Sequence, residues 1–466
     1  MKRTLFLTSL LLALSLSQAA TFTVTDTTNG TTTDGVSLRW AITQANSFST
    51  HDTIVFNIPG LAPHTIAVSP ELPDIYDSYL LIDGTSQPAN GYTGTDPKII
   101  ISNLDTADNG LYFFVPYTAK VKGIQISNFT EAGIYAFGSA VLITVEECVL
   151  SHNHDGVSIF GSVAHGDIHN SSMLENANAG VYVFGASAYA LIENNLISGN
   201  GNSGIVINGG SDSCTIRGNR IGTDSSGTLP YPNALHGIYL ANSDNVIGGA
   251  LPGEGNIIAY NGGAGIYVSS GYYNLISRNS IFCNVGVGIS NNFSPPVISN
   301  ATTTSANGTA PANSRIELFY DSSCTNCQGK TFIDEVFADS TGAWTYTGTL
   351  LLNSSITATA TDTLNSTSKF SACYVILTSS LTEMVNHTAV HLYPNPAQNY
   401  LNISFDKEIA AGEVNVFNSF GEKVYEGFSE NKSSIQINTE RFSSGIYFLQ
   451  IIPPEGISLY RFTVVK

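Results

Sequence analysis

Five ionisable residues recur at nearly constant spacing in the middle of the chain, and together they could perform acid–base chemistry. They lie 24, 23, 24 and 24 residues apart: Lys122, Glu146, His169, Glu193 and Arg217. Each follows an aliphatic residue directly. If a repeat places them side by side, a basic residue could neutralise a uronate while His169 abstracts a proton, as a polysaccharide lyase requires. The alternative, which we favour, is a ladder of surface ion pairs that contributes little energy per pair.

This spacing reflects a repeat that runs from about Val121 to Ser290. A glycine followed by an aliphatic residue begins each copy, and successive copies start 23, 24, 24, 33, 28 and 23 residues apart. The starting residues are Gly133, Gly156, Gly180, Gly204, Gly237, Gly265 and Gly288. Self-similarity at such a period indicates stacked supersecondary units.

The apolar runs within each repeat are too short for helices. Runs such as Val181-Tyr182-Val183 alternate inward and outward as half-buried strands do, and Gly, Asn and Ser separate them. Three short strands per lap, each pairing in parallel with its equivalent about 4.8 Å away, predict an all-β chain built on a β-solenoid. Residues one lap apart then become neighbours, so Ile168, Ile192 and Ile216 should form one buried stack.

An asparagine recurs at one turn of the repeat. Side-chain amides at strand spacing can bond to one another and to the turn backbone, so we expect a structural ladder and no catalytic role. Its members are Asn153, Asn176, Asn200, Asn261 and Asn284.

Aromatic and loop residues are the candidates for binding a glycan. Four tyrosines share one position of the glycine pattern, and such a row suits stacking on sugar rings, although β-propensity alone also places aromatics on exposed strands. They are Tyr135, Tyr182, Tyr239 and Tyr267. Two laps carry insertions, and loops on a rigid scaffold often carry function. These insertions contribute Asp224, Tyr231, His236 and Glu254.

We expect no metal site in the chain, with one cofactor left open. Calcium could bind the turn around Asp224, but no Asp-rich loop of recognised spacing accompanies that residue. Four of the nine histidines lie within eighteen residues: His152, His154, His165 and His169. Their spacings match no zinc signature, so we interpret these positions as solvated turns.

The chain has six cysteines, an even number that permits disulfides in a secreted protein. They are Cys148, Cys214, Cys283, Cys324, Cys327 and Cys373. The first three lie singly in different laps, and we expect them to be small buried core residues. The Cys-x-x-Cys pair has metal or redox spacing, but no second pair or nearby His completes a site. We therefore expect a bridge from Cys324 or Cys327 to Cys373.

Charge and hydropathy limit the partners and the compartment. With 36 acidic and 18 basic residues, the formal charge is −18, which argues against nucleic acid because phosphate binding requires clustered Lys and Arg. Residues 1–19 resemble a signal peptide, with Lys2-Arg3, an apolar core and a small-residue cleavage site ending at Ala19. Its removal would leave 16 − 36 = −20. No later apolar run reaches the roughly 18 residues of a membrane span.

The region before the repeats holds one amphipathic segment. Residues 37–46 have apolar residues at helical spacing, with Asp34 or Ser37 as the cap. A solenoid exposes its core at each end, so we expect this helix to cover the first lap.

This region resembles the N-terminal part of bacterial β-helix proteins of the CSLREA type. The likeness rests on residues 37–46, 53–60 and 82–85, with Val36 in place of the usual Cys and Trp40 in place of the usual Glu. Residues 218–224, 248–249 and 255–258 resemble the repeats of the same family. The resemblance implies a right-handed, pectin-lyase-like parallel β-helix over residues 20–294. That superfamily includes lyases, hydrolases, epimerases and adhesins, so the resemblance does not select an activity.

Two further segments follow the repeats. Alternating strands over residues 295–377 predict a small β-sandwich that resembles an immunoglobulin-like module, and residues 378–390 read as a polar linker. Residues 391–466, which open with Leu392-Tyr393-Pro394-Asn395-Pro396, resemble the type A C-terminal sorting domain of the type IX secretion system. The resemblance implies a Bacteroidota bacterium, contact with the type IX machinery, and attachment to the cell surface or release.

Two functions remain open. We favour a secreted or cell-surface protein that binds polysaccharide or acts as an adhesin, with these binding candidates: Tyr182, Tyr239, Tyr267, Tyr231, Asp224 and His236. The alternative is a polysaccharide lyase or glycoside hydrolase acting on an acidic glycan through the five ionisable residues. Such an enzyme needs a Lys or Arg base, or a close carboxylate pair, in a cleft. The scarcity of basic residues disfavours binding of a polyanion.

Overall fold

A computed structural model describes the chain except residues 1–18, 48–50, 106, 115–117, 139–141, 163–164, 186–188, 322–323, 325, 377–389 and 453–457. The expected signal peptide, apart from Ala19, and nearly all of the expected linker therefore lie outside the described residues. The chain forms two compact units, residues 1–377 and 378–466.

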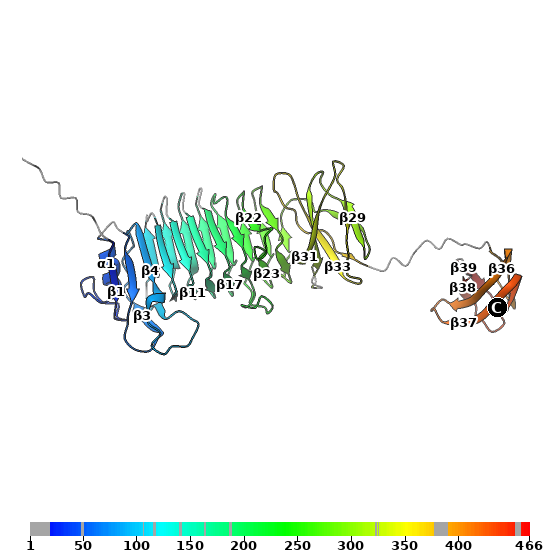
Figure 1. Cartoon of the computed structure of the whole chain (residues 1–466), viewed down its shortest axis with the longest axis horizontal. Helices are drawn as coiled ribbons and strands as arrows, with labels where there is room; N and C mark the ends of the chain where they lie inside the picture. The colour runs from blue at the N-terminus through cyan, green and yellow to red at the C-terminus, as the bar shows by residue number, and fades with distance from the viewer. Residues whose placement is uncertain are drawn as a thin grey trace, which may run out of the picture. The chain divides into compact units, whose positions relative to one another are not determined.

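Three parallel sheets wind into a right-handed solenoid in the first unit (Figure 1). Sheet A contains β1 (Thr21–Val24), β2 (Thr53–Phe56), β4 (Tyr79–Asp83), β7 (Thr118–Lys122), β10 (Leu142–Glu146), β13 (His165–His169), β16 (Tyr189–Glu193), β19 (Thr215–Arg217), β22 (Val246–Gly248) and β25 (Leu275–Ser277). Sheet B contains β3 (His64–Val68), β5 (Ile99–Asn103), β8 (Ile124–Ser127), β11 (Val149–Ser151), β14 (Ser172–Leu174), β17 (Leu196–Ser198), β20 (Arg220–Ile221), β23 (Ile257–Ala259) and β26 (Ser280–Phe282). Sheet C contains β6 (Leu111–Phe114), β9 (Ala132–Phe137), β12 (Asp155–Phe160), β15 (Val181–Phe184), β18 (Ile205–Asn208), β21 (Ile238–Leu240), β24 (Ile266–Val268) and β27 (Ile289–Ser290).

The solenoid core consists of aliphatic stacks, as the repeat predicts. Ile168 pairs with Ile192, which pairs with Ile216, and all three are fully buried. This stack confirms that residues one lap apart are spatial neighbours. Burial of apolar surface in every lap is the main favourable term in folding, at about 25 cal/mol per Å².

The predicted asparagine ladder lies at the turn between sheets B and C. Each member donates from its side-chain amide to the side-chain oxygen of the next, with Asn176 to Asn200 at 3.0 Å. Asn233, from the longest lap, occupies a rung that the sequence pattern did not reveal. A second ladder at the turn between sheets A and B contains Asn195, Asn219, Asn256 and Asn279.

A helix covers the first lap, as expected. Helix α1 (Leu38–Ala45) begins at Ser37, whose hydroxyl accepts a hydrogen bond from the Trp40 N–H. Its buried face packs on β1 and β2 and consists of Leu38, Ala41, Ile42 and Ala45. A short 3-10 helix, η1 (Gly84–Ser86), follows β4.

The module after the solenoid has two antiparallel sheets and covers the last lap (Figure 1). One contains β28 (Val297–Ala301), β29 (Ser305–Thr309) and β32 (Ala343–Thr347); the other contains β30 (Arg315–Asp321), β31 (Gly329–Phe337), β33 (Ser355–Thr361) and β34 (Tyr374–Val375). The Gln328 side chain ends the first asparagine ladder, because it accepts from the Asn284 amide at 3.0 Å and donates to the Asn284 carbonyl at 2.8 Å. Phe370 packs against the core of the last lap.

One disulfide joins the last lap to the module, and a second lies within the module. Cys327 bonds to Cys373, which is one of the two alternatives expected. Cys283 bonds to Cys324, so its interpretation as an unpaired core residue was wrong. The other two, Cys148 and Cys214, are free and buried.

The second unit is antiparallel. It contains β35 (Val390–Tyr393), β36 (Tyr400–Asn418), β37 (Lys423–Asn438), β38 (Gly445–Ile452) and β39 (Ser458–Val464). Its core includes Leu401, Val414, Val416, Leu449 and Ile451, all fully buried.

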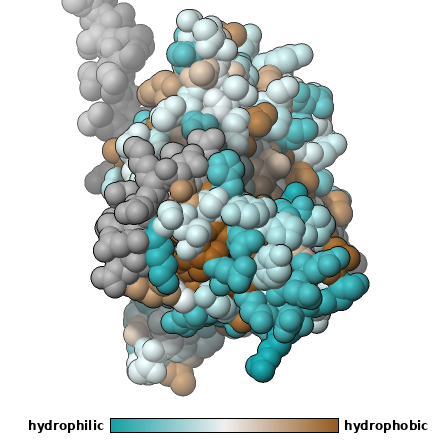
Figure 2. All heavy atoms as spheres, turned by 90° about the vertical axis from the view of Figure 1, so that its right-hand side faces the viewer, coloured by the Kyte–Doolittle hydropathy of each residue, from teal (hydrophilic) through white to brown (hydrophobic). Residues whose placement is uncertain are grey.

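Figure 2 shows that hydrophilic residues dominate the face turned to the viewer and that hydrophobic residues form a small patch on it. Among the described residues, no helix has the length and hydropathy to cross a membrane.

Candidate functional site

The five ionisable residues lie in one row across sheet A. Parallel pairing puts Lys122 beside Glu146, Glu146 beside His169, His169 beside Glu193, and Glu193 beside Arg217. They stand at the ends of five successive strands, and all five side chains are half-buried. The repeat therefore predicted their adjacency correctly.

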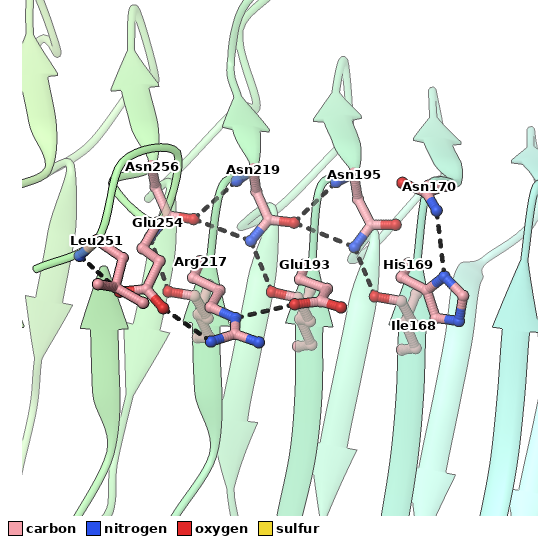
Figure 3. A network of polar contacts seen from close by, with 12 residues as sticks. Ile168, His169, Asn170, Glu193, Asn195, Arg217, Asn219, Leu251, Glu254 and Asn256 are labelled. Atoms are coloured by element: carbon pink, nitrogen blue, oxygen red, sulfur yellow. Dashed lines mark hydrogen bonds and ion pairs between the residues drawn. The ribbon is translucent and has the colours of Figure 1, made fainter. Parts of the chain in front are cut away.

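Charged members of this row are engaged in ion pairs. Arg217 lies between two carboxylates, with its Nε 2.9 Å from Glu193 and its Nη1 2.9 Å from Glu254 (Figure 3). These contacts, first of all the hydrogen bond to Glu193, raise the pKa of Arg217. The carboxylate of Glu146 pairs with Lys120 and with Lys122, the latter at 3.6 Å. Its pKa is lowered, chiefly by the hydrogen bond from Lys120.

His169 occupies the centre of the row and has a weaker contact. Its Nδ1 lies 3.3 Å from the Asn170 side-chain amide (Figure 3). The backbone carbonyl of Ile168 beside it accepts from Asn195 at 2.8 Å, so the asparagine ladder holds the strand end in place. The arrangement is that of an ion-pair ladder with one histidine in it.

A second row, on sheet C, is aromatic. We call it the aromatic strip; it consists of Tyr112, Phe114, Tyr135, Phe137, Phe160, Tyr182 and Phe184. Rings on neighbouring strands pack at 5.3–5.8 Å between centroids. The strip covers four consecutive strands, β6, β9, β12 and β15. Such offset packing fixes each ring by its neighbours.

Two of the four phenylalanines of the strip are exposed. Phe137 is 41 % exposed and Phe184 is 39 % exposed, while the other members are half-buried. The sequence pattern predicted Tyr135 and Tyr182 but neither Tyr112 nor the phenylalanine column. That column has its own signal, because its members recur at intervals of 23, 23 and 24 residues: Phe114, Phe137, Phe160 and Phe184.

The predicted tyrosine row is interrupted. Ser158 and Val206 take the positions on either side of Tyr182. Beyond Val206, Tyr239 and Tyr267 pack at 5.7 Å, and His236 stacks on Tyr267 at 4.5 Å. Burial lowers the pKa of His236, and its Nδ1 accepts from the Ala264 N–H at 3.0 Å.

Tyr231 and Asp224 lie in the insertion of the longest lap, apart from the aromatic strip. The Tyr231 hydroxyl donates to Glu175 at 2.5 Å; burial and this bond raise its pKa to about 12. Glu175 also pairs with His152 at 2.7 Å. The Asp224 carboxylate accepts from Ser226 and from the N–H groups of residues 228 and 229, which stabilises its own turn.

The Asp224 carboxylate is surrounded by hydroxyl and N–H groups that donate hydrogen bonds to it. Calcium instead requires several oxygen ligands, mainly from carboxylates and carbonyls. Calcium at this turn stays a prediction. No group of three or more His, Cys, Asp or Glu side chains within the described ranges is arranged to hold a metal ion.

An open cavity of about 540 Å³ lies beside the turns between sheets A and B. The segment after η1 forms one wall with Tyr92, Asp96 and Lys98, and Glu147 and Asn170 line the other. Among the described residues that line it, none belongs to the predicted site.

Comparisons with known proteins agree with this architecture. A family model described as right handed beta helix region matches residues 109–247, and one described as secretion system C-terminal sorting domain matches residues 391–464. No curated protein matches the chain.

Solved structures resemble it only distantly. Pectate lyase Pel9A has 14 % identity and a TM-score of 0.31, over 56 % of this chain and 80 % of its own. A tailspike protein from bacteriophage CAB120 of Escherichia coli O157:H7 has 11 % identity and a TM-score of 0.23, over 91 % and 65 %. A two-domain fibronectin type III segment from chicken tenascin has 12 % identity and a TM-score of 0.16, over 38 % and 100 %.

The class of protein follows from these observations. The chain is a right-handed parallel β-helix protein that carries a secretion-system C-terminal sorting domain. That domain directs it through type IX secretion to the cell surface or the extracellular space.

Proposed function

We propose that this protein, from a Bacteroidota bacterium, binds polysaccharide at the cell surface or outside the cell through the aromatic strip. The observation that carries the proposal is the strip itself: seven rings in two adjoining columns on one sheet, with Phe137 and Phe184 exposed. Clustered apolar side chains on a soluble surface usually mark a binding site. Aromatic rings fit the C–H faces of sugar rings.

The charges near the strip favour a neutral glycan. The pKa of Tyr135 is raised by burial first, then by Tyr112, and then by the charges of Glu131 and Asp155. The charge of Asp155 also contributes, after burial, to the raised pKa of Tyr182. Carboxylates in these positions repel a polyanion. The excess of acidic residues in the whole chain acts in the same direction.

Substitution of the open rings tests the proposal. Phe137→Ser and Phe184→Ser should each weaken binding of a neutral polysaccharide roughly fivefold, which corresponds to about 1 kcal/mol for one aromatic contact. Affinity electrophoresis in gels that contain a panel of neutral and acidic polysaccharides measures this retardation. The matched control is Phe337→Ser, because Phe337 is 66 % exposed on β31, outside the strip.

Retardation that is equal in wild type and both strip variants would contradict the assignment of the site. Retardation by acidic polysaccharides alone would contradict the neutral substrate class.

The competing function, a lyase or hydrolase acting through the row on sheet A, is decided by product formation. Unsaturated-product absorbance and reducing ends should not increase on any polysaccharide of the panel. If they do increase for wild type, and His169→Ala abolishes the increase, the row is catalytic and the protein is an enzyme. The ion pairs of Glu146 and Arg217 disfavour this outcome, because they neutralise the groups that a uronate would need.

A further inference from the structure

Two carboxylates are buried on neighbouring segments at the N-terminal end of the solenoid, where the Leu81 N–H donates to the Asp52 carbonyl at 3.0 Å. Asp52 immediately precedes β2 and is 1 % exposed; Asp77 lies two residues before β4 and is 2 % exposed. Burial of charged groups is costly unless a cation or several hydrogen bonds compensate them. The structure places neither residue in the predicted binding or catalytic rows.

A nitrogen atom already contacts this pair. The backbone nitrogen of Ala20 lies 2.8 Å from Oδ1 of Asp52. The carbonyl of the same residue accepts from the Thr53 N–H at 2.9 Å, and β1 and β2 pair in parallel from Thr21 and Thr53 onward. The strand register therefore holds the Ala20 nitrogen beside Asp52.

Asp77 has no such compensation. Neither of its buried oxygens accepts a hydrogen bond of normal geometry from a described residue. Burial, and then the charge of Asp52, raise the pKa of Asp77 to about 6, while the N–H groups of Tyr79 and Ser78 and the charge of His51 oppose the increase. His51 itself stacks on Tyr79, at 4.3 Å between ring centroids. Within the described residues, Asp77 lacks a proton donor of normal geometry or a cation that would compensate its charge.

We infer that the acid pair Asp52–Asp77 is a binding site for the α-ammonium group of Ala20, which removal of the leader peptide after Ala19 creates. Hydrolysis of the Ala19–Ala20 peptide bond consumes one water and leaves a carboxylate on Ala19 and a protonated amine on Ala20. The neutral N–H that contacts Asp52 before cleavage becomes a cation with three N–H donors.

This change supplies a cation near Asp77, the carboxylate that lacks one. One N–H of the ammonium keeps the bond to Asp52, and its charge favours ionisation of the neighbouring Asp77. A charge-assisted hydrogen bond is roughly twice as strong as a neutral one. Processing at the correct bond therefore stabilises the first laps, and cleavage one residue earlier or later misplaces the cation. The inference is independent of the proposed glycan binding.

The test compares two full-length mature chains, residues 20–466 with a free Ala20 amine and residues 19–466 with one residue more. A carboxylate pair raises the pKa of an amine from its usual range of about 7.7–8.0, and one pKa unit lowers the reactive, deprotonated fraction about tenfold. At pH 7, acylation of the Ala20 amine should be at least about tenfold slower than acylation of the Ala19 amine, measured by mass spectrometry of the N-terminal peptide.

Asp77→Asn in the chain that begins at Ala20 should restore part of the lost reactivity, and Asp108→Asn, a change at an exposed acid elsewhere in the unit, should not. If Asp77→Asn does not fold, the comparison between the two wild-type chains decides alone. Equal acylation of the Ala20 and Ala19 amines would overturn the inference. A secreted protein whose N-terminal residue is not Ala20 would overturn it as well.

Discussion

At the scale of single residues, each ladder asparagine makes several buried hydrogen bonds with one side chain. Asn219 donates to the Ile192 carbonyl at 2.8 Å and to Asn256 at 2.9 Å, and it accepts from both the backbone and side-chain nitrogens of Asn195. All these groups are buried in turns where water cannot replace the missing partner. The ladder thus satisfies backbone groups that the tight corners between sheets leave outside the strand pairing.

Removal of one rung should therefore be costly. Asn219→Ala leaves at least two buried polar groups without partners, at about 1–3 kcal/mol each, so we expect a loss of about 2–6 kcal/mol in the free energy of unfolding. Chemical denaturation followed by far-ultraviolet circular dichroism measures it. Asn292→Ala, a change at an exposed asparagine of the same unit, is the control and should stay within about 0.5 kcal/mol of wild type. An equal effect of the two changes would mean that the ladder contributes no stability.

A second residue-scale prediction concerns Glu317, which is buried between the solenoid and the module. It accepts from the Ser277 hydroxyl at 2.5 Å and from the Arg278 N–H at 3.0 Å. Burial raises its pKa, so the folded state keeps a proton that the unfolded chain releases near pH 4.5. The stability linked to this proton is present below that pH and is lost as pH rises through the folded-state pKa.

Glu317→Gln removes this titration. Relative to wild type, the variant should gain stability as pH rises above about 4.5, because only wild type must then ionise a buried group. Thermal unfolding of both proteins at several pH values measures the difference. Glu131→Gln, at an exposed glutamate, should show no such trend. A difference between Glu317→Gln and wild type that does not change with pH would contradict the assignment.

At the scale of elements, periodic contacts could be predicted from the sequence and non-periodic contacts could not. Parallel pairing depends only on spacing, so the stack through Ile192 and the row through His169 followed from the repeat alone. Asn233 was missed because its lap is longer than the others and shifts it out of period. The bond between Cys283 and Cys324 was missed because it joins the last lap to a loop of a different fold, where no repeat sets the distance.

In the candidate site, too, the residues at periodic positions could be predicted and those in insertions could not. Tyr182 was predicted to face outward, and the structure places it in the aromatic strip. The phenylalanine column could not be predicted from the glycine pattern, because its members lie one position beyond the four residues of that pattern. Tyr231 and Asp224 came from an insertion, and an insertion folds according to its own turn contacts, so its position relative to the strip could not be derived from spacing.

At the scale of the whole molecule, the two ends of the chain differ in how they depend on the solenoid. The module of residues 295–376 shares one compact unit with the solenoid, and it covers Ile276, Ile281 and Ile289 of the last laps. The sorting domain forms a separate unit with its own core. A solenoid without a terminal cover exposes its apolar core to water.

Two truncations should therefore have opposite effects. A chain that ends at residue 294 loses the module as well as the sorting domain, so we expect it to aggregate and to bind a hydrophobic dye, because its last lap is uncovered.

A chain that ends at residue 377 loses only the sorting domain. It should remain folded and monomeric by size-exclusion chromatography, with unchanged retardation by the neutral polysaccharide. In the native host this second chain should accumulate inside the cell envelope, because type IX export depends on residues 391–464. A soluble chain ending at residue 294 would show that the module is not needed as a cover, and export of the chain ending at residue 377 would show that another segment carries the sorting signal.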